Sequence, residues 1–151
     1  MSNKQEEQMN TEKTYDRPLP HNYEAERVLL GAMLVEPDAF DEATNVVDEN
    51  DFFRVTHQHL FKTMVDIKHA GRELNLKAME AALPGGVELG ATNCGVAYMK
   101  TLIAGLPNII DVTHYARIVR EKSILRELIY SAGRILSAAY VDLNEKEPYT
   151  H

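Results

Sequence analysis

The sequence contains a single cysteine, Cys94, so the chain cannot form an internal disulfide. One cysteine suits a reducing compartment, and we expect a cytoplasmic protein. No uncharged apolar run approaches the roughly 18 residues that a membrane-spanning helix needs. Residues 1–16 are polar and of mixed charge, without the apolar stretch of a secretory signal. These absences indicate a protein that works away from membranes.

Positive charge is also scarce. The chain has 16 Lys and Arg residues against 23 Asp and Glu residues, and its net charge is −7 at pH 7. A protein that neutralises DNA phosphates by itself normally carries an excess of positive charge. Only residues 112–140 are locally basic, with five basic and two acidic side chains. We therefore expect DNA to be bound only weakly or indirectly.

Apolar residues recur at helical spacing along most of the chain, and no segment shows the alternation of a strand. The pattern predicts five short helices, with Phe52 and Phe53 filling the core ahead of the third. The first of these helices runs from after Asn22 to near Leu34, and the second from Pro37 to the loop 48–51. The third runs from after Phe53 to Gly71, the fourth from after Asn75 to Leu83, and the fifth from Val96 to Pro107.

Asp111 is expected to cap the longest periodic segment, which runs from Val112 to about Tyr140. It forms either one long helix or a helical hairpin bent near Ser131–Gly133. The predicted fold class is all-α: a compact globule of about five short helices plus a long C-terminal helix or helical hairpin.

Segment 112–140 is apolar over about half of its surface, whereas one core-facing stripe needs about a third. Such a helix is either sandwiched inside its own domain or meets another chain. We favour association with a second copy or a partner, and internal burial is the alternative. The residues expected to form this interface are Tyr115, Ile118, Leu125, Ile129, Ala132 and Leu136.

A glycine-rich loop, residues 85–92, has the spacing of a phosphate-binding P-loop. Ala91 occupies the position of the lysine that contacts the phosphates, and Glu88 adds negative charge to the loop. The segment before the loop also reads as a helix, whereas a P-loop follows a strand. We expect no nucleotide-binding site here.

The other chemistry-bearing residues do not form a site in the sequence. His57 and His59 are two positions apart on a predicted helix, so they point in different directions and cannot share a metal. We expect the histidines to be solvated or half-buried. The carboxylates lie in acidic runs of the kind found on solvated surfaces. We expect no catalytic residue, no metal site and no cofactor, and hence no enzyme.

Four local patterns together resemble the N-terminal domain of the DnaB-type bacterial replicative DNA helicases, and they cover about residues 17–140 in the family's order. They are the run from Pro18 to Leu34, Asp51-Phe52-Phe53-Arg54 with His57 and Leu60-Phe61, Gly95-Val96-Ala97-Tyr98-Met99, and the run from Tyr115 to Arg126.

The resemblance implies a helical globule plus a helical hairpin. In this family hairpins pair into dimers, and three dimers form a hexameric collar. The resemblance also implies docking of the primase C-terminal domain and contact with helicase loaders, as part of a primosome. Tyr98, Ile129 and Ile135 fall at positions similar to those implicated in primase docking. ATP and Mg²⁺ belong to the family's motor domain, which follows a linker.

The expected organisation is a disordered tail at 1–20, a helical globule at 21–107, a self-association segment at 108–140 and the start of a linker toward the ATPase domain at 141–151. The leading hypothesis is a non-catalytic oligomerisation and protein-docking domain of a replicative helicase. The alternatives are a small DNA-binding regulator and a truncated helicase paralogue that acts as an adaptor.

Overall fold

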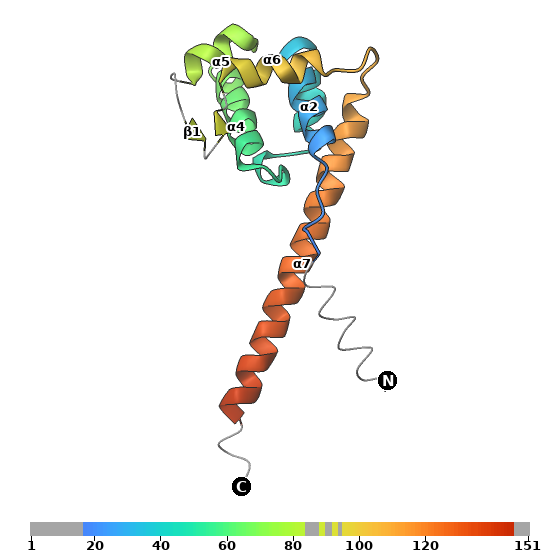
Figure 1. Cartoon of the computed structure of the whole chain (residues 1–151), viewed down its shortest axis with the longest axis vertical. Helices are drawn as coiled ribbons and strands as arrows, with labels where there is room; N and C mark the ends of the chain where they lie inside the picture. The colour runs from blue at the N-terminus through green and yellow to red at the C-terminus, as the bar shows by residue number, and fades with distance from the viewer. Residues whose placement is uncertain (1–16, 84–87, 90–91, 94, 147–151) are drawn as a thin grey trace.

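The computed structural model describes residues 17–83, 88–89, 92–93 and 95–146 of the chain. It shows a helical globule from which one long helix projects (Figure 1). The described helices are α2 (Tyr23–Val35), α3 (Ala39–Thr44), a 3₁₀ turn η1 (Glu49–Asp51), α4 (Val55–His69), α5 (Leu76–Ala82), α6 (Val96–Ala104) and α7 (Val112–Lys146). The all-α class is confirmed, and the only described strands are the two-residue β1 (Glu88–Leu89) and β2 (Thr92–Asn93), paired antiparallel.

Helix α2 lies at the centre of the globule. Its run Val28–Leu34 is buried at every position, so this part of the helix is enclosed on all sides. This is what its sequence dictates, because a helix that is apolar all round has no face to offer water. Helices α3, α4, α6 and the first part of α7 pack around it. The core therefore contains residues from near both ends of the described chain, in α2 and in α7.

Gly31 allows α6 to cross close to α2. A Cβ added at this position would lie 2.7 Å from the main-chain oxygen of Leu102. The atom it would meet is backbone, so a side chain here requires the two helices to move apart. The glycine fixes the depth at which α6 sits on α2.

The helix ends follow the predicted capping pattern. Asn22 accepts a hydrogen bond from the main-chain N of Ala25 at 2.9 Å, and Asn75 accepts one from Ala78 at 2.8 Å. Gly71 has a φ of +73°, and it follows α4 as the sequence predicts. The main-chain N of Arg72 then donates to Ile67 at 3.1 Å, which closes the helix in a Schellman-type turn.

The paired aromatics before α4 separate, which corrects the expectation that both fill the core. Phe52 is buried and contacts Phe61 with ring centroids 5.1 Å apart. Phe53 is only half-buried and stacks on His21 at the edge of the globule. The chain is extended at this point, so successive side chains point to opposite sides.

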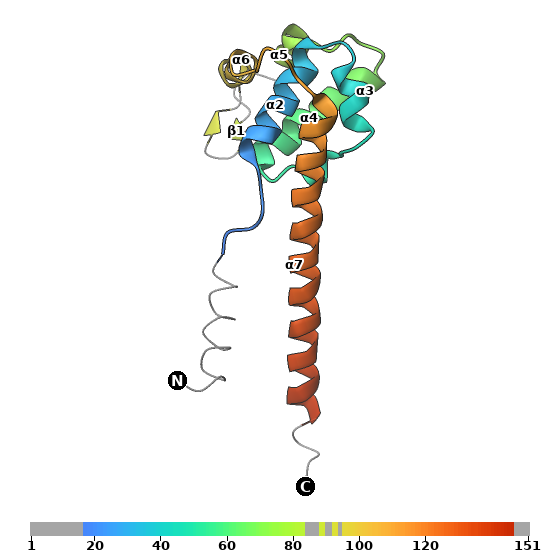
Figure 2. The same ribbon diagram turned by 90° about the vertical axis from the view of Figure 1, so that its right-hand side faces the viewer.

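Helix α7 is one continuous helix, so the hairpin alternative with a bend near Ser131–Gly133 is wrong for the described residues. No proline occurs between Pro107 and Pro148, and a lone glycine costs a helix only about 1 kcal/mol. The helix also continues to Lys146, past the boundary expected at 140. Its first part packs into the globule through Val112, Ala116 and Val119. Figure 2 shows the later part of α7 standing clear of the globule.

Four sequence predictions fall wholly or partly on residues outside the described ranges. These are the tail at 1–16, most of the P-loop-like run 85–92, Cys94, and the end of the expected linker at 147–151. Residues 17–22, which belong to or adjoin the expected tail, are described and run as an extended segment into α2. Within the described part of the chain, no helix has the length and apolarity required to cross a bilayer.

Candidate protein-docking interface

Helix α7 has two parts with different surroundings. In its first part, one residue in every three or four is buried against the globule: Val112, Ala116, Val119, Ser123 and Arg126. Beyond Arg126, none of the described side chains at 127–142 is buried. The segment after Arg126 is called the arm below.

The arm and the turn before it carry a large exposed apolar surface: Ile124, Leu125, Leu128, Ile129, Tyr130, Ile135, Leu136, Tyr140 and Val141. Scattered apolar residues are normal on a protein surface, but a continuous apolar face marks an interaction site. This surface is the candidate site.

Most of these exposed residues form two adjoining rows on the helix, whereas Tyr130 and Val141 lie on its other side. At 100° per residue, Leu125, Ile129, Ala132 and Leu136 fall within an arc of about 60°. Ile124, Leu128 and Ile135 fall in a second row beside it. The first row lies roughly 130° around the helix from the buried face of the first part, so a partner on it need not compete with the globule.

The structure separates the predicted interface residues into two groups. Tyr115 and Ile118 are half-buried against the core of their own globule. Leu125, Ile129, Ala132 and Leu136 are exposed. Internal burial therefore fits the start of α7 better, and the exposed side chains that the association hypothesis needs lie in its later part.

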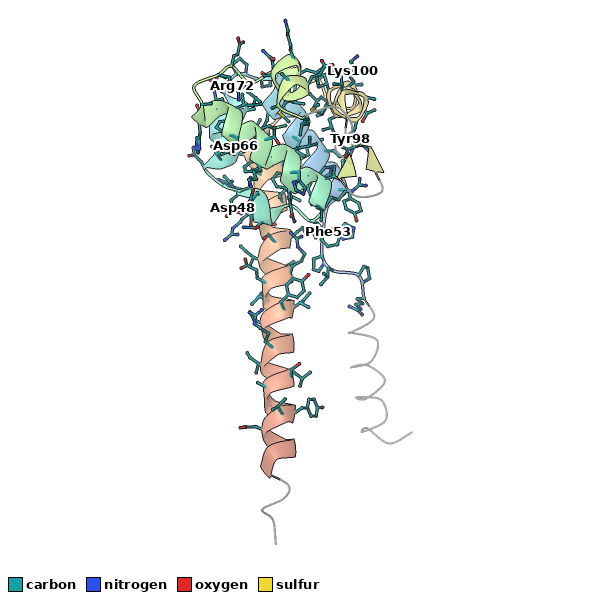
Figure 3. The ribbon with its side chains drawn as sticks, turned by 90° about the vertical axis from the view of Figure 1, so that its left-hand side faces the viewer. Asp48, Phe53, Asp66, Arg72, Tyr98 and Lys100 are labelled. Carbon is teal, nitrogen blue, oxygen red and sulfur yellow. The ribbon has the colours of Figure 1, made fainter. Side chains whose placement is uncertain are left out.

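The primase-docking candidates are also divided. Ile129 and Ile135 lie on α7 with 47% and 71% of their surface exposed. Tyr98 lies on α6 in the globule, half-buried (Figure 3). The structure does not bring Tyr98 into one patch with the arm.

A buried polar chain, missed in the sequence, links α2, α4 and α6. His57 is 0% exposed, which corrects the expectation of solvated or half-buried histidines. Its Nδ1 lies 2.8 Å from Oε1 of Glu26, and its Nε2 lies 2.6 Å from the hydroxyl of Tyr98. A carboxylate can only accept, so Nδ1 donates and Nε2 of a neutral ring accepts from Tyr98.

Glu26 also caps the start of α4. Its Oε2 accepts from the main-chain N of Phe53 at 3.0 Å, and its Oε1 from Arg54 at 3.4 Å. Arg54 is the N-cap residue of α4 and makes no side-chain cap of its own. A carboxylate from another helix thus satisfies amides that the N-terminus leaves unpaired. The H-bond partners of Glu26 are 27 to 31 residues away, so no local motif signals them.

A second polar cluster holds α7 to η1. Asp51 is only 3% exposed, which corrects the expectation that the acidic runs are solvated. Its Oδ1 accepts from Arg120 at 2.7 Å, and its Oδ2 accepts from the main-chain N of Asp48 at 2.8 Å. Hydrogen bonding and the charge of Asp51 together raise the pKa of Arg120 above its ordinary value. As the pH rises from neutral, Arg120 therefore keeps its proton, and its pairing with Asp51, until that raised pKa is reached.

Arg126 joins a third segment to this cluster. It is 6% exposed, and it donates to the carbonyl of Pro20 at 2.8 Å and to the carbonyl of Asp51 at 2.7 Å. Its guanidinium also lies 5.3 Å from the ring centroid of Phe53. Figure 3 shows Phe53 at the edge of the globule where the extended segment begins.

None of these clusters resembles a catalytic centre. The described residues contain no group of three or more His, Cys, Asp or Glu side chains arranged to hold a metal. The buried polar side chains of the described residues have hydrogen-bond partners within the fold. Their arrangement serves packing and orientation, and the arm is the feature that the fold leaves unpaired.

Comparison with known proteins agrees with this architecture. Residues 18–121 match the family model described as the DnaB-like helicase N terminal domain. The chain is 35% identical over 130 residues to the replicative DNA helicase DnaB of Geobacillus stearothermophilus, covering 86% of this chain and 28% of the relative. It is 33% identical over 132 residues to the replicative DNA helicase DnaC of Bacillus subtilis, covering 87% and 29%.

The fold matches a solved structure as well. The crystal structure of the N-terminal domain of DnaB helicase from Mycobacterium tuberculosis superposes with a TM-score of 0.76 at 29% identity, covering 83% of this chain and 89% of that one. The chain spans less than a third of the length of the curated relatives described above. Since the family model covers more than half of its residues, the chain belongs to the DnaB-like helicase N-terminal domain family.

Proposed function

We propose that this chain is a non-catalytic oligomerisation and protein-docking domain of a replicative DNA helicase. The observation that carries the proposal is the exposed apolar arm of α7, whose described side chains at 127–142 include none that is buried. Exposed apolar rows of this length are stabilised when a second helix covers them. The role is one of binding, so it needs no cofactor from this chain. ATP hydrolysis would belong to the motor domain that the family resemblance places after a linker.

The occupant we propose for the first row is a second copy of the chain. Leu125, Ile129, Ala132 and Leu136 are spaced four, three and four residues apart, which is the spacing of a helix–helix seam. Two copies can present the same row to each other in a symmetric dimer. Three such dimers would form the hexameric collar that the resemblance implies.

We expect the isolated 151-residue chain to self-associate. Light scattering coupled to size-exclusion chromatography, over a concentration series, measures its mass. A mass of about two or six times the 17.1 kDa of one chain is expected, because closed assemblies favour such multiples. A monomer at the highest concentration would contradict the assembly role.

Docking of a primase C-terminal domain and of a helicase loader is the second part of the proposal. Ile129 and Ile135 offer exposed apolar contacts for it. Tyr98 differs from them, because its hydroxyl lies within hydrogen-bonding distance of His57. We propose that Tyr98 affects docking through the position of α6.

Ile135→Ala is expected to weaken binding of a primase C-terminal domain by about tenfold or more, because burying an isoleucine contributes about 1.5–3 kcal/mol. Isothermal titration calorimetry at a fixed protomer concentration measures the affinity. Ile109→Ala is the matched control, since Ile109 is 90% exposed and lies in the loop before α7. Equal losses in the two variants would remove Ile135 from the docking surface.

A further inference from the structure

The root of the arm is held by a single buried guanidinium. Arg126 contacts three parts of the molecule: the extended segment through Pro20, η1 through Asp51, and the loop before α4 through Phe53. It is also the last buried residue described on α7. The helix leaves the globule directly after this contact.

Both hydrogen bonds from Arg126 go to main-chain carbonyls of other segments. A guanidinium is a planar fork, so the two acceptors must stand at fixed positions relative to the helix. Removing such a group from water is unfavourable, and this cost is offset only when the geometry of its hydrogen bonds is maintained. The contact therefore resists rotation and tilting of α7 at this point.

The extended segment that Arg126 holds is itself braced. The ring of His21 stacks on Phe53 with centroids 4.8 Å apart and an interplanar angle of 12°. The Nδ1 of His21 lies 2.7 Å from the carbonyl oxygen of Leu19. Phe53 thus contacts both the ring of His21 and the guanidinium of Arg126, and it connects the segment before α2 to α7.

We propose that Arg126 is a positioning residue that sets the direction of the arm relative to the globule. The arm from Arg126 to Lys146 is about 30 Å long, so a tilt of about 10° at its root displaces the tip by about 5 Å. A closed ring of subunits needs one fixed rotation between neighbours, and variation in that rotation gives open or mixed assemblies. The consequence for assembly rests on the proposed function, whereas the direction of the arm is a property of one chain.

The test measures an intramolecular distance by pulsed electron resonance. Spin labels are placed in a Cys94→Ser background at Lys77→Cys on α5 and Ser137→Cys on the arm, both at exposed positions. Labelled chains are diluted with unlabelled chains, so that distances between protomers do not contribute. Arg126→Met, which keeps the apolar stem and removes the donors, is expected to broaden the distance distribution by roughly 5 Å.

Arg134→Met is the matched control, because Arg134 is an exposed arginine that donates to Ser131 on the same helix. It should leave the distribution at its parental width. Arg126→Lys keeps the charge and loses the planar fork, and it should also broaden the distribution. If circular dichroism shows that the Arg126→Met variant does not fold, the Arg126→Lys variant is used for the test instead.

A folded Arg126 variant with the parental distribution would overturn the proposal, because the packing of Val112, Ala116 and Val119 would then suffice to direct the arm. Light scattering on the same samples separates this outcome from failure of the proposed function. A broadened distribution in a chain that never self-associates would retain the positioning role and contradict the assembly role. A broadened distribution with a mixture of masses would support both.

Discussion

Glu26→Ala is expected to lower the free energy of unfolding by about 3–5 kcal/mol, because it leaves three hydrogen-bond donors without their acceptor and each such buried group costs about 1–3 kcal/mol. The substitution leaves the buried imidazole of His57 without its carboxylate partner and removes the acceptor of the Phe53 and Arg54 amides. Domains of this size are stable by about 5–15 kcal/mol, so the loss is a large share of the total. Urea denaturation followed by circular dichroism at 222 nm measures it.

Glu24→Ala is the matched control for this prediction. Glu24 lies in the same first turn of α2 but is exposed, and its favourable contact with the helix dipole contributes about 0.3–1 kcal/mol. Glu26→Gln should fall between the two variants, because an amide keeps one acceptor oxygen and the shape of the side chain. If Glu26→Ala cost no more than Glu24→Ala, the buried chain from Glu26 to Tyr98 would contribute little to stability.

The secondary structure could be predicted because its signals are local. Asn22, Asn75 and Gly71 each act within three to five residues, and the structure confirms all three ends. The central position of α2 agrees with its run Val28–Leu34, which is apolar at every position. The all-α fold is then formed when the other helices pack on α2.

The polar contacts between helices could not be predicted in the same way. Glu26 has an ordinary place in the first turn of a helix, and nothing near it shows that the chain turns its carboxylate inward. Asp51 and Arg126 lie 75 residues apart, and their contact depends on how η1 packs on α7. The mistaken expectation of solvated histidines has the same origin, since the partners of His57 lie on two other helices.

The candidate site was partly visible in the sequence. The sequence shows that residues 112–140 carry more apolar surface than packing against one core requires. Periodicity alone could not show where along this helix the side chains stop being buried. Only the packed structure separates the half-buried Tyr115 and Ile118 from the exposed Leu125 and Ile129. Arg126 lies at the boundary between the part of α7 that packs on the globule and the exposed arm.

Ile129→Asp is expected to raise the dissociation constant of the self-associated chain by roughly a thousandfold. In a symmetric seam each dimer buries two such charges without partners, and a penalty of about 4 kcal/mol corresponds to that factor. The fold of the single chain should be unaffected, because Ile129 is 47% exposed there. Light scattering should report the 17.1 kDa monomer at concentrations where the parent chain is associated.

Ile109→Asp introduces the same charge at an exposed isoleucine outside α7, and it should keep the parental mass. Ile135→Asp tests the second row of the arm, which lies beside the first. If only Ile129→Asp dissociates the assembly, a second copy covers the first row and the second row remains available to a different partner. If neither arm variant changes the mass while the parent chain is associated, the copies meet through the globule, and the apolar arm serves docking alone.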